Sequence, residues 1–169
     1  AGPSESKVPD SQSAYEPAIN VLLSAMAGAN YIHDAAGLLE SGLTISLQTY
    51  VIDNDIAGMA RRVLAGIEVD PDKLALDCIK RVGPGGNYLG DEHTTAHMRD
   101  EFFYPVLADR KPRMVWEAEG KLSAEERARL LAISYLENHK PIPIDPEVDS
   151  QIRKEISEML PETGKVYGE

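Results

Sequence analysis

The chain has 169 residues, 43% of them hydrophobic, which is enough for one globular core. Its 28 acidic and 17 basic residues give a net charge of -11, which argues against binding to nucleic acid or to an anionic membrane. The single cysteine, Cys78, excludes a disulfide framework. We find no signal peptide and no apolar run of about 18 residues, so we expect a cytoplasmic protein.

Two long helices are predicted in the N-terminal part of the chain. Ser13 and Glu16 have the spacing of a capping box, and a helical period of apolar residues then continues to Gly28. Ser46 is the expected N-cap of the second helix, which should end at Gly66. The residues expected to face inward are Tyr15, Ala18, Ile19, Leu22 and Met26 in the first helix, and Ile52, Ile56, Met59, Ala60 and Val63 in the second.

A third helix is predicted from Asp70, with Pro71 at its first position, to Gly83. Only two short strands are predicted, at residues 31–33 and 43–45. Long helices alternating with short strands are typical of the βα units of a barrel. A complete (β/α)₈ barrel needs about 250 residues. We therefore expect either an α-rich domain or the last βα units of a TIM barrel followed by a helical tail.

The helical tail is predicted from two further start signals. Ser123 and Glu126 form a capping box, and Asp145 with Pro146 begins the last helix. The residues expected to face inward are Ala128, Leu131, Ala132 and Tyr135 in the first of these helices, and Val148, Ile152, Ile156 and Met159 in the second. Such apolar stripes are typical of packing elements, so we expect no chemistry from this tail.

Two loops carry polar residues that are candidates for chemistry. Glu5 and Lys7 lie on the opening loop, and a desolvated lysine can act as a nucleophile or form a Schiff base. A solvated loop lysine is the simpler alternative. Tyr31, His33 and Asp34 lie at the end of a predicted strand, where a barrel would place a proton-handling or hydrogen-bonding pair. Asp34 could instead be a helix cap.

Residues 83–105 form a third candidate. Its glycines allow close approach of the backbone, and exposed amides there could hold an anion. His93 and His97 would share one face of a helix, as in zinc proteases, but Thr94 stands where those enzymes have glutamate. Because no cysteine lies nearby to complete a structural site, we predict no metal site. Residues 99–116, with mixed charges and aromatics, indicate a loop packed across the core or a cage for an amine.

Four segments together carry a resemblance to a known family. They are SESKVPDSQSAYE, AGANYIHDAAGLLESG, VGPGGNYLGDEHTTAHMRDEFFYP and DRKPRMVWEAEGKLSAEERAR, and in this order they resemble the C-terminal part of the trimethylamine:corrinoid methyltransferase family. The resemblance implies that residues 1–110 are the C-terminal part of a TIM barrel and residues 111–169 a helical extension. It also implies that the N-terminal strands of the barrel are absent from this chain.

The family moves a methyl group from a methylated amine to the Co(I) centre of a separate corrinoid protein. Its trimethylamine enzymes carry pyrrolysine, a lysine acylated on its side chain, while relatives with an ordinary residue act on quaternary amines such as glycine betaine. The resemblance places Lys7 in the region of this special residue. Glu5 or Asp34 would then balance the charge of the amine, and Tyr31 and His33 would line the pocket.

The corrinoid partner is expected to dock over the open mouth of the barrel. The rim that faces it would include Gly85, Gly86, His93 and Arg99. We expect a homo-oligomer, and we expect little activity from this chain alone, because half a barrel leaves open sheet edges. Two alternatives stay open: a quaternary-amine methyltransferase without pyrrolysine, and a non-catalytic α-rich module whose acidic surface binds a basic partner.

Overall fold

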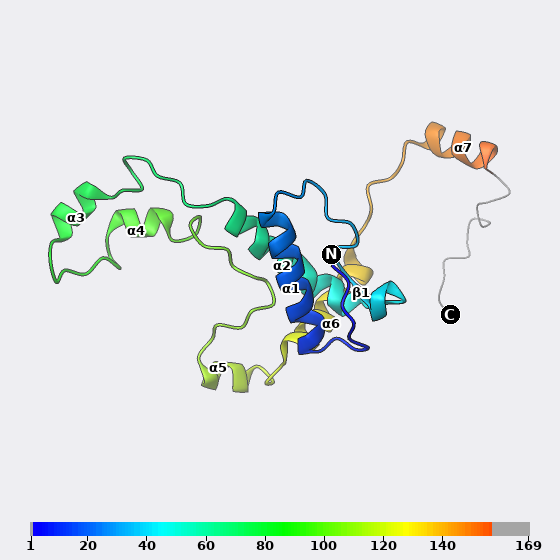
Figure 1. Cartoon of the computed structure of the whole chain (residues 1–169), viewed down its shortest axis with the longest axis horizontal. Helices are drawn as coiled ribbons and strands as arrows, with labels where there is room; N and C mark the ends of the chain where they lie inside the picture. The colour runs from blue at the N-terminus through cyan, green and yellow to red at the C-terminus, as the bar shows by residue number, and fades with distance from the viewer. Residues whose placement is uncertain (1, 157–169) are drawn as a thin grey trace. The chain divides into compact units, whose positions relative to one another are not determined.

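The computed structural model describes residues 2–156, and in this range it contains seven α-helices and one two-stranded sheet (Figure 1). The packing divides the chain into two compact units, residues 1–137 and residues 138–169. The boundary expected near residue 110 concerns the complete protein and stays a prediction. None of the helices between residues 2 and 156 is long and apolar enough to cross a membrane.

Helix α1 (Ser11–Met26) begins earlier than predicted, because its N-cap is Asp10. The Asp10 carboxylate accepts a 3.0 Å hydrogen bond from the Ser13 N–H, so the expected capping box of Ser13 and Glu16 is wrong. The buried face of α1 consists of Ser13, Pro17 and Val21. The predicted inward face is wrong for its largest members: Tyr15, Ile19 and Met26 are each more than half exposed.

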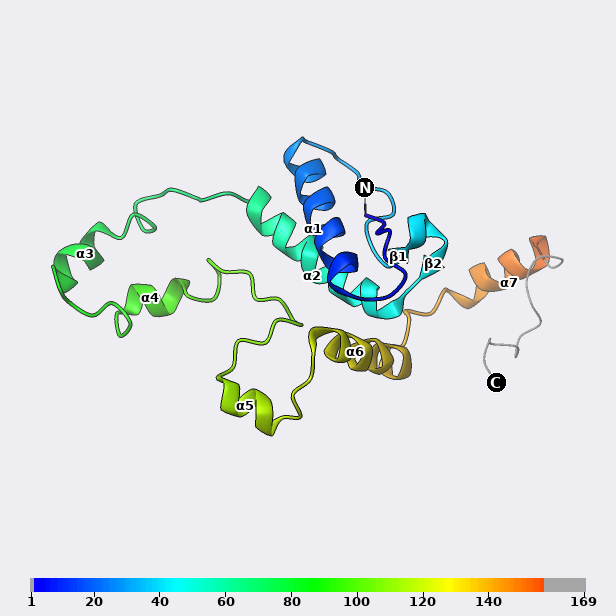
Figure 2. The ribbon, with the colours of Figure 1, turned by 60° about the horizontal axis from the view of Figure 1, so that its bottom comes forward.

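Helix α2 (Leu47–Leu64) lies beside α1 (Figure 2). Its N-cap is Ser46, whose hydroxyl accepts a hydrogen bond from the Thr49 N–H, and the helix stops before Gly66, so both predicted ends are confirmed. Ile56 and Ala60 are buried as predicted. The buried face continues, unexpectedly, through polar residues one turn apart, namely Thr49 and Asp53.

The sheet is an antiparallel hairpin of β1 (Leu38–Leu39) and β2 (Thr44–Ile45), joined by the 3-10 helix η1 (Glu40–Gly42). The predicted strand at residues 43–45 is thus confirmed in part, whereas the strand expected at residues 31–33 is wrong, because these residues form a loop. The α-rich prediction is confirmed. The barrel stays a prediction for the complete protein.

The helices that follow α2 are short, apart from α6. Helix α3 (Leu76–Val82) starts later than predicted, because Asp70 caps a turn and Ala75 adopts a left-handed φ of 52°. It ends at Gly83 as predicted, and Cys78 is buried. Next come α4 (Glu92–His97) and α5 (Arg113–Ala118).

Helix α6 (Ala124–Asn138) starts at the predicted capping box. The Ser123 hydroxyl accepts from the Glu126 N–H at 3.1 Å, and the Glu126 carboxylate accepts from the Ser123 N–H at 2.6 Å. Ala128 and Ala132 are buried, whereas Tyr135 is exposed. The apolar core of the first unit is made of Val21, Leu39, Ile56, Ala60, Cys78, Leu107, Ala128 and Ala132.

The second unit contains helix α7 (Pro146–Glu155). Its N-cap is Asp145 as predicted, because the carboxylate accepts hydrogen bonds from the N–H groups of Glu147 and Val148. No residue of α7 is buried. Val148, Ile152 and Ile156, which were expected to face inward, are exposed, and Met159 lies outside the described residues.

Candidate functional site

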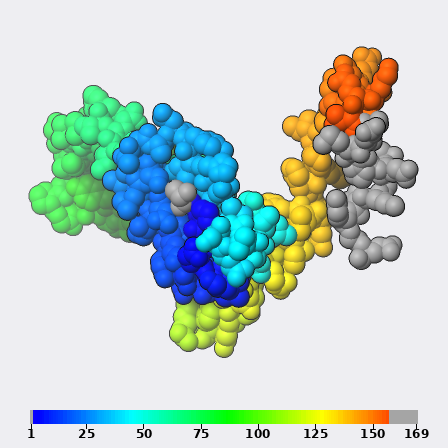
Figure 3. Space-filling view, turned by 45° about the vertical axis from the view of Figure 1, so that its right-hand side comes forward, coloured from blue at the N-terminus to red at the C-terminus, as the bar shows by residue number. Residues whose placement is uncertain are grey.

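The opening segment, residues 2–6, runs along the hairpin (Figure 3). The Ser4 N–H donates to the Leu38 carbonyl at 3.0 Å, and the Glu40 N–H donates to the Ser6 carbonyl at 3.2 Å. Ser4 and Ser6 are both buried. The backbone that carries Glu5 and Lys7 is therefore held on both sides of Glu5, while these two side chains point outward.

Glu16 of α1 fixes the opening segment from the other side. Its carboxylate accepts hydrogen bonds from the Ser4 hydroxyl at 2.6 Å, the Glu5 N–H at 2.9 Å and the Gln12 side chain at 2.9 Å. These donors, the Ser4 hydroxyl first, hold the pKa of Glu16 below its ordinary value. Glu16 is therefore a clamp for this loop and not the second half of a cap.

Glu5 and Lys7 are both exposed, and the loop brings them together. The Lys7 ammonium donates a 2.6 Å hydrogen bond to the backbone carbonyl of Glu5. The Glu5 carboxylate accepts a hydrogen bond from the Ser41 hydroxyl at 2.5 Å, which ties the segment to η1. Lys7 is thus placed at the surface of an anchored loop.

Tyr31, His33 and Asp34 lie on the loop between α1 and β1. His33 Nδ1 lies 2.7 Å from Asp34 Oδ2, so the predicted hydrogen-bonding pair forms. Asp34 adopts a left-handed φ of 53° and caps no helix. Tyr31 is 79% exposed and its ring centroid lies 6.1 Å from that of His33. These side chains present polar groups to solvent.

The two predicted groups share one side of the first unit. A Cβ on Gly2 would lie 2.1 Å from the Asp34 carbonyl oxygen, so the opening segment crosses directly over the loop that carries His33 and Asp34. Within residues 2–156, however, no hydrogen bond or ion pair joins Lys7 to His33 or to Asp34. The two loops are therefore neighbours, but Lys7 does not contact the His33–Asp34 pair through a hydrogen bond or an ion pair.

Asp53 is a buried carboxylate that the sequence did not reveal. Its Oδ2 accepts a 2.8 Å hydrogen bond from the Gly37 N–H, and its Oδ1 has no partner among the described residues. The residue is only 2% exposed, and burial raises its pKa to about 6. The sequence feature that could have predicted its burial is its position in α2, one turn from Thr49 and on the same face as Ile56.

The predicted rim residues lie between α2 and α5. We call residues 63–100 the α3–α4 lobe. Gly85 has a left-handed φ of 73°, and a Cβ on Gly86 would lie 2.3 Å from the Val82 carbonyl oxygen, so both glycines serve a tight turn. Arg99 is exposed, and His93 lies on α4. No hydrogen bond or ion pair of residues 2–156 joins these rim residues to Glu5 or Lys7.

Asp91 joins α3 to α4 through an ion pair and a hydrogen bond. Arg81 pairs with Asp91, the N-cap of α4, at 2.8 Å. The Asp91 carboxylate also accepts a 3.3 Å hydrogen bond from the Cys78 thiol. Burial is the main cause that raises the pKa of the Cys78 thiol, and its hydrogen bond to the negatively charged Asp91 raises it further. The raised pKa is consistent with the structural role predicted for this cysteine.

The aromatic segment packs against α2 through Phe103, and the amine cage stays a prediction. A Cβ on Gly58 would lie 2.2 Å from Phe103 Cζ, so the Phe103 ring covers this glycine. The Arg62 guanidinium donates to the Glu101 backbone carbonyl at 2.8 and 3.1 Å. The Tyr104 hydroxyl donates to the Met98 carbonyl. These contacts agree with a loop packed across the core.

An open cavity of about 660 Å³ lies among α1, α2, residues 105–108 and the start of α6. It is lined mostly by apolar side chains, and none of the predicted site residues lines it. Tyr15, Ile52 and Met59, which were expected to face a core, border this cavity. The apolar faces of α1 and α2 thus turn toward a space that the described residues leave partly open.

A family model described as trimethylamine methyltransferase (MTTB) matches residues 1–163. The chain is 39% identical over 163 residues to a trimethylamine methyltransferase of Desulfitobacterium hafniense (strain DSM 10664 / DCB-2), covering 96% of this chain and 32% of that protein. It is 39% identical over 145 residues to a trimethylamine methyltransferase of Methanosarcina thermophila, covering 86% of this chain and 30% of that protein. It is also 33% identical over 164 residues to a glycine betaine methyltransferase of Desulfitobacterium hafniense (strain Y51), covering 97% of this chain and 34% of that protein. The chain therefore spans about a third of the length of these relatives.

Proposed function

Because the chain belongs to the trimethylamine methyltransferase family, we propose that it is the C-terminal part of an enzyme that transfers a methyl group from trimethylamine to a corrinoid on a partner protein. The match over residues 1–163 carries this proposal, and the 39% identity to two trimethylamine methyltransferases supports the substrate. In the reaction, the N–CH₃ bond of the protonated amine breaks, its electron pair stays on nitrogen so that dimethylamine leaves, and Co(I) supplies the electron pair of the new Co–CH₃ bond.

We propose that the complete protein is a (β/α)₈ barrel. The exposed apolar faces of this chain support that architecture, since Ile19, Leu23 and Met26 leave one side of α1 without cover. Further strands and helices of a barrel would bury this face. A homo-oligomer could also cover part of it, and oligomerisation stays a prediction.

Lys7 is the residue that we propose as the special lysine of the family. Its exposed side chain leaves room for an acyl group, and its hydrogen-bond partner among the described residues is the Glu5 backbone carbonyl. An acylated Nζ keeps one N–H and can still donate to that carbonyl, so the position fits pyrrolysine. The pyrrolysine ring would supply an electrophilic imine that engages the amine. The anchored backbone on either side of Glu5 would hold this group in a fixed place.

Carboxylates near this position fit a cationic methyl donor. Glu5 is held by Ser41, and Asp34 lies under the opening segment. We propose that these two carboxylates balance the positive charge of the amine, and that Tyr31 and His33 line its pocket. Both ring side chains are more than 70% exposed and are therefore available to substrate or to other parts of the enzyme.

The rim of the α3–α4 lobe is proposed to face the corrinoid partner. Gly85 and Gly86 make a tight turn there, and Arg99 adds an exposed positive charge. A quaternary-amine substrate is the second candidate, because the chain is 33% identical to a glycine betaine methyltransferase over nearly its whole length.

The mass of the peptide that contains residue 7 tests the substrate assignment. We expect the mass of pyrrolysine at this position in the natural protein. An unmodified lysine would contradict the trimethylamine proposal and favour a quaternary amine. In parallel, the complete protein is mixed with its reduced corrinoid partner and either trimethylamine or glycine betaine, and methylation of cobalt is followed by absorbance. If cobalt is methylated neither with trimethylamine nor with glycine betaine, the proposed activity is contradicted.

A further inference from the structure

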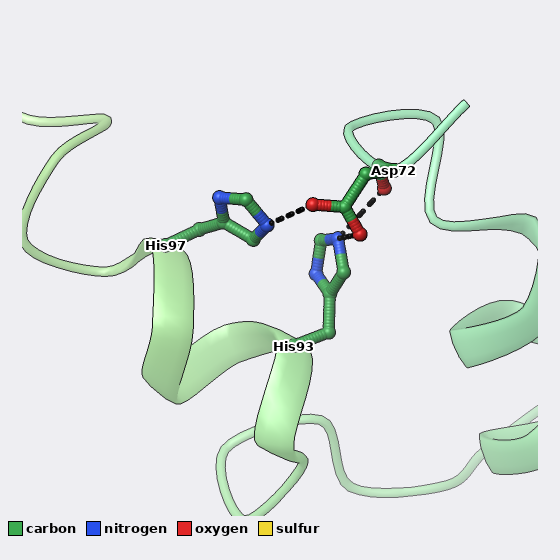
Figure 4. A group of neighbouring side chains, drawn as sticks. All are labelled: Asp72, His93 and His97. Atoms are coloured by element: carbon green, nitrogen blue, oxygen red, sulfur yellow. Dashed lines mark hydrogen bonds and ion pairs between the residues drawn. The ribbon is translucent and has the colours of Figure 1, made fainter. Parts of the chain in front are cut away.

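Asp72, His93 and His97 form a cluster to which the proposed methyl transfer assigns no chemical step (Figure 4). The two histidines lie one turn apart on α4, and their ring centroids are 4.3 Å apart. Both Nε2 atoms point toward Asp72. His97 Nε2 lies 3.1 Å from Oδ2, and His93 Nε2 lies 4.0 Å from Oδ1.

We propose that Asp72, His93 and His97 bind a divalent transition-metal ion, and that Zn²⁺ is the ion that fits best. One ligand atom from each residue lies within 4.8 Å of the others. Zinc bonds to nitrogen and oxygen of about 2.1 Å place tetrahedral ligand atoms about 3.4 Å apart. The separations of 3.1 and 4.0 Å between the carboxylate and the two rings lie on either side of this value.

The donor atoms select the class of ion. Two imidazole nitrogens with one carboxylate suit zinc and its first-row neighbours, whereas calcium and magnesium prefer oxygen ligands throughout. The only nearby thiol, that of Cys78, is buried and donates its hydrogen to Asp91. Three protein ligands would leave the fourth position of a tetrahedral ion to water.

The α3–α4 lobe has little else to stabilise it. Between residues 61 and 100 Cys78 is the only buried residue, and its side chain is the only apolar one that is buried. Small units with few buried side chains depend on disulfides or metals, and a chain with one cysteine has no internal disulfide. A metal ion would join the turn at Asp72 to residues that follow it by 21 and 25 positions. Its role would therefore be a structural cross-link.

The same cluster could instead be held by hydrogen bonds alone. His93 Nε2 lies 2.8 Å from the Asp72 backbone carbonyl, and in that case each ring would carry its proton on Nε2 and donate to Asp72. A metal ion needs the lone pair of Nε2, so the proton must then lie on Nδ1. Because one nitrogen cannot donate a hydrogen bond and bind a metal at once, the two arrangements can be separated by measuring metal binding.

The test uses the complete protein, purified without a histidine-containing tag and freed of metal with a chelator. Zn²⁺ is then titrated against a chromophoric chelator. We expect one tightly bound zinc ion per chain. Removing a residue that only hydrogen-bonds to a zinc ligand weakens zinc binding about 10- to 100-fold. Loss of a ligand itself should cost at least as much, so His93→Gln, His97→Gln and Asp72→Asn should each weaken zinc binding at least tenfold. The matched control His139→Gln, which alters an exposed histidine of the second unit, should bind zinc as the wild type does.

A second measurement guards against unfolded variants. Co²⁺ is added to each protein, and we expect the visible absorption of tetrahedral cobalt in the wild type and in His139→Gln, and its loss in His97→Gln. Circular dichroism should show the same helix content in all five proteins. The absence of one-to-one zinc binding, or wild-type affinity in both His93→Gln and His97→Gln, would overturn the proposal. Neither zinc titration nor cobalt absorption measures methyl transfer. The outcome for the metal site is therefore independent of whether the proposed methyltransferase function is correct.

Discussion

The backbone N–H of Gly37 donates a 2.8 Å hydrogen bond to Oδ2 of Asp53, which joins the loop before β1 to the buried face of α2. This is the one contact that Asp53 makes through its carboxylate among residues 2–156, and its other oxygen is buried without a partner. A carboxylate in these surroundings is destabilised when it is ionised. Its protonation state therefore links the stability of this region to pH.

We predict that the free energy of unfolding contains a component from Asp53 that falls as pH rises. Burial raises the pKa of Asp53 from 3.8 to about 6, so the folded state binds the proton more tightly than the unfolded state does. This component is fully present below about pH 4 and is lost as pH rises through about 6. At about 1.36 kcal/mol for each pKa unit, the loss is about 3 kcal/mol.

Asp53→Asn should remove this component, because asparagine stays neutral and keeps an oxygen that accepts from the Gly37 N–H. Relative to the wild type, the variant should gain stability between about pH 4 and about pH 7, as measured by urea unfolding. Asp77→Asn, at an exposed aspartate, is the matched control and should show no such gain. A difference between wild type and Asp53→Asn that does not change with pH would contradict the prediction.

Asp55 should be important for holding the loop before α5. Its buried carboxylate accepts hydrogen bonds from the Val106 N–H at 3.1 Å and from the Leu107 N–H at 2.8 Å. Asp55→Ala leaves both donors without their partner and should destabilise the protein by about 2–4 kcal/mol. Thermal unfolding measures the effect. The neighbouring exposed Asn54→Ala should change stability by less than about 0.5 kcal/mol, and equal effects of the two substitutions would count against this role of Asp55.

Gly58 is predicted to be required because of Phe103. A methyl group at position 58 would lie 2.2 Å from Phe103 Cζ, and overpacking of this kind costs about 1–3 kcal/mol. Alanine also favours the helix by about 1 kcal/mol, so Gly58→Ala should be neutral to destabilising in the wild type and stabilising in a Phe103→Ala background. A double-mutant cycle measures this coupling, and additive effects would show that the ring does not restrict position 58.

Cys78 should react slowly with alkylating reagents in the folded protein, because it is buried and its thiol pKa is raised. Asp91→Asn removes a negative charge beside the thiol and leaves Arg81 nearby, so the pH at which the alkylation rate reaches half its maximum should fall. Cys78 is the single cysteine of this chain, and mass spectrometry of the peptide that contains it reports its alkylation. Asp77→Asn serves as the control, and a midpoint that moves upward in Asp91→Asn would rule out this electrostatic effect.

The sequence predicted helix ends well where the signal is local. Ser46 and the capping box at Ser123 were correct, because each cap bonds to residues within one turn. The start of α1 was wrong for a physical reason. Glu16 has the right spacing from Ser13 for a capping box, but its oxygens bind Ser4 and the Glu5 backbone instead. Such a contact between a helix and a distant segment leaves no trace in local spacing.

The candidate site shows the same limit. The spacing of His93 and His97 was sufficient to predict that they share a helix face, and the structure confirms it. Asp72 could not be predicted as their neighbour, because it lies 21 and 25 positions before them. The turn that follows Asp72 also has a left-handed backbone at Ala75, which no propensity favours for alanine. The buried face of α1 and the polar part of the buried face of α2 could not be predicted either, because periodicity identifies an apolar face but not the element that covers it.

The bonds from Arg62 to Glu101 close the α3–α4 lobe at its base, since residues 39 positions apart meet there. Lys73 adds a 2.9 Å ion pair to the Glu101 carboxylate from inside the lobe. The segments that enter and leave the lobe therefore contact each other at one junction, next to the last turn of α2. We expect natural relatives to tolerate insertions, deletions and exchanged loops within residues 63–100. The helices α1 and α2, which precede the junction, should keep their length.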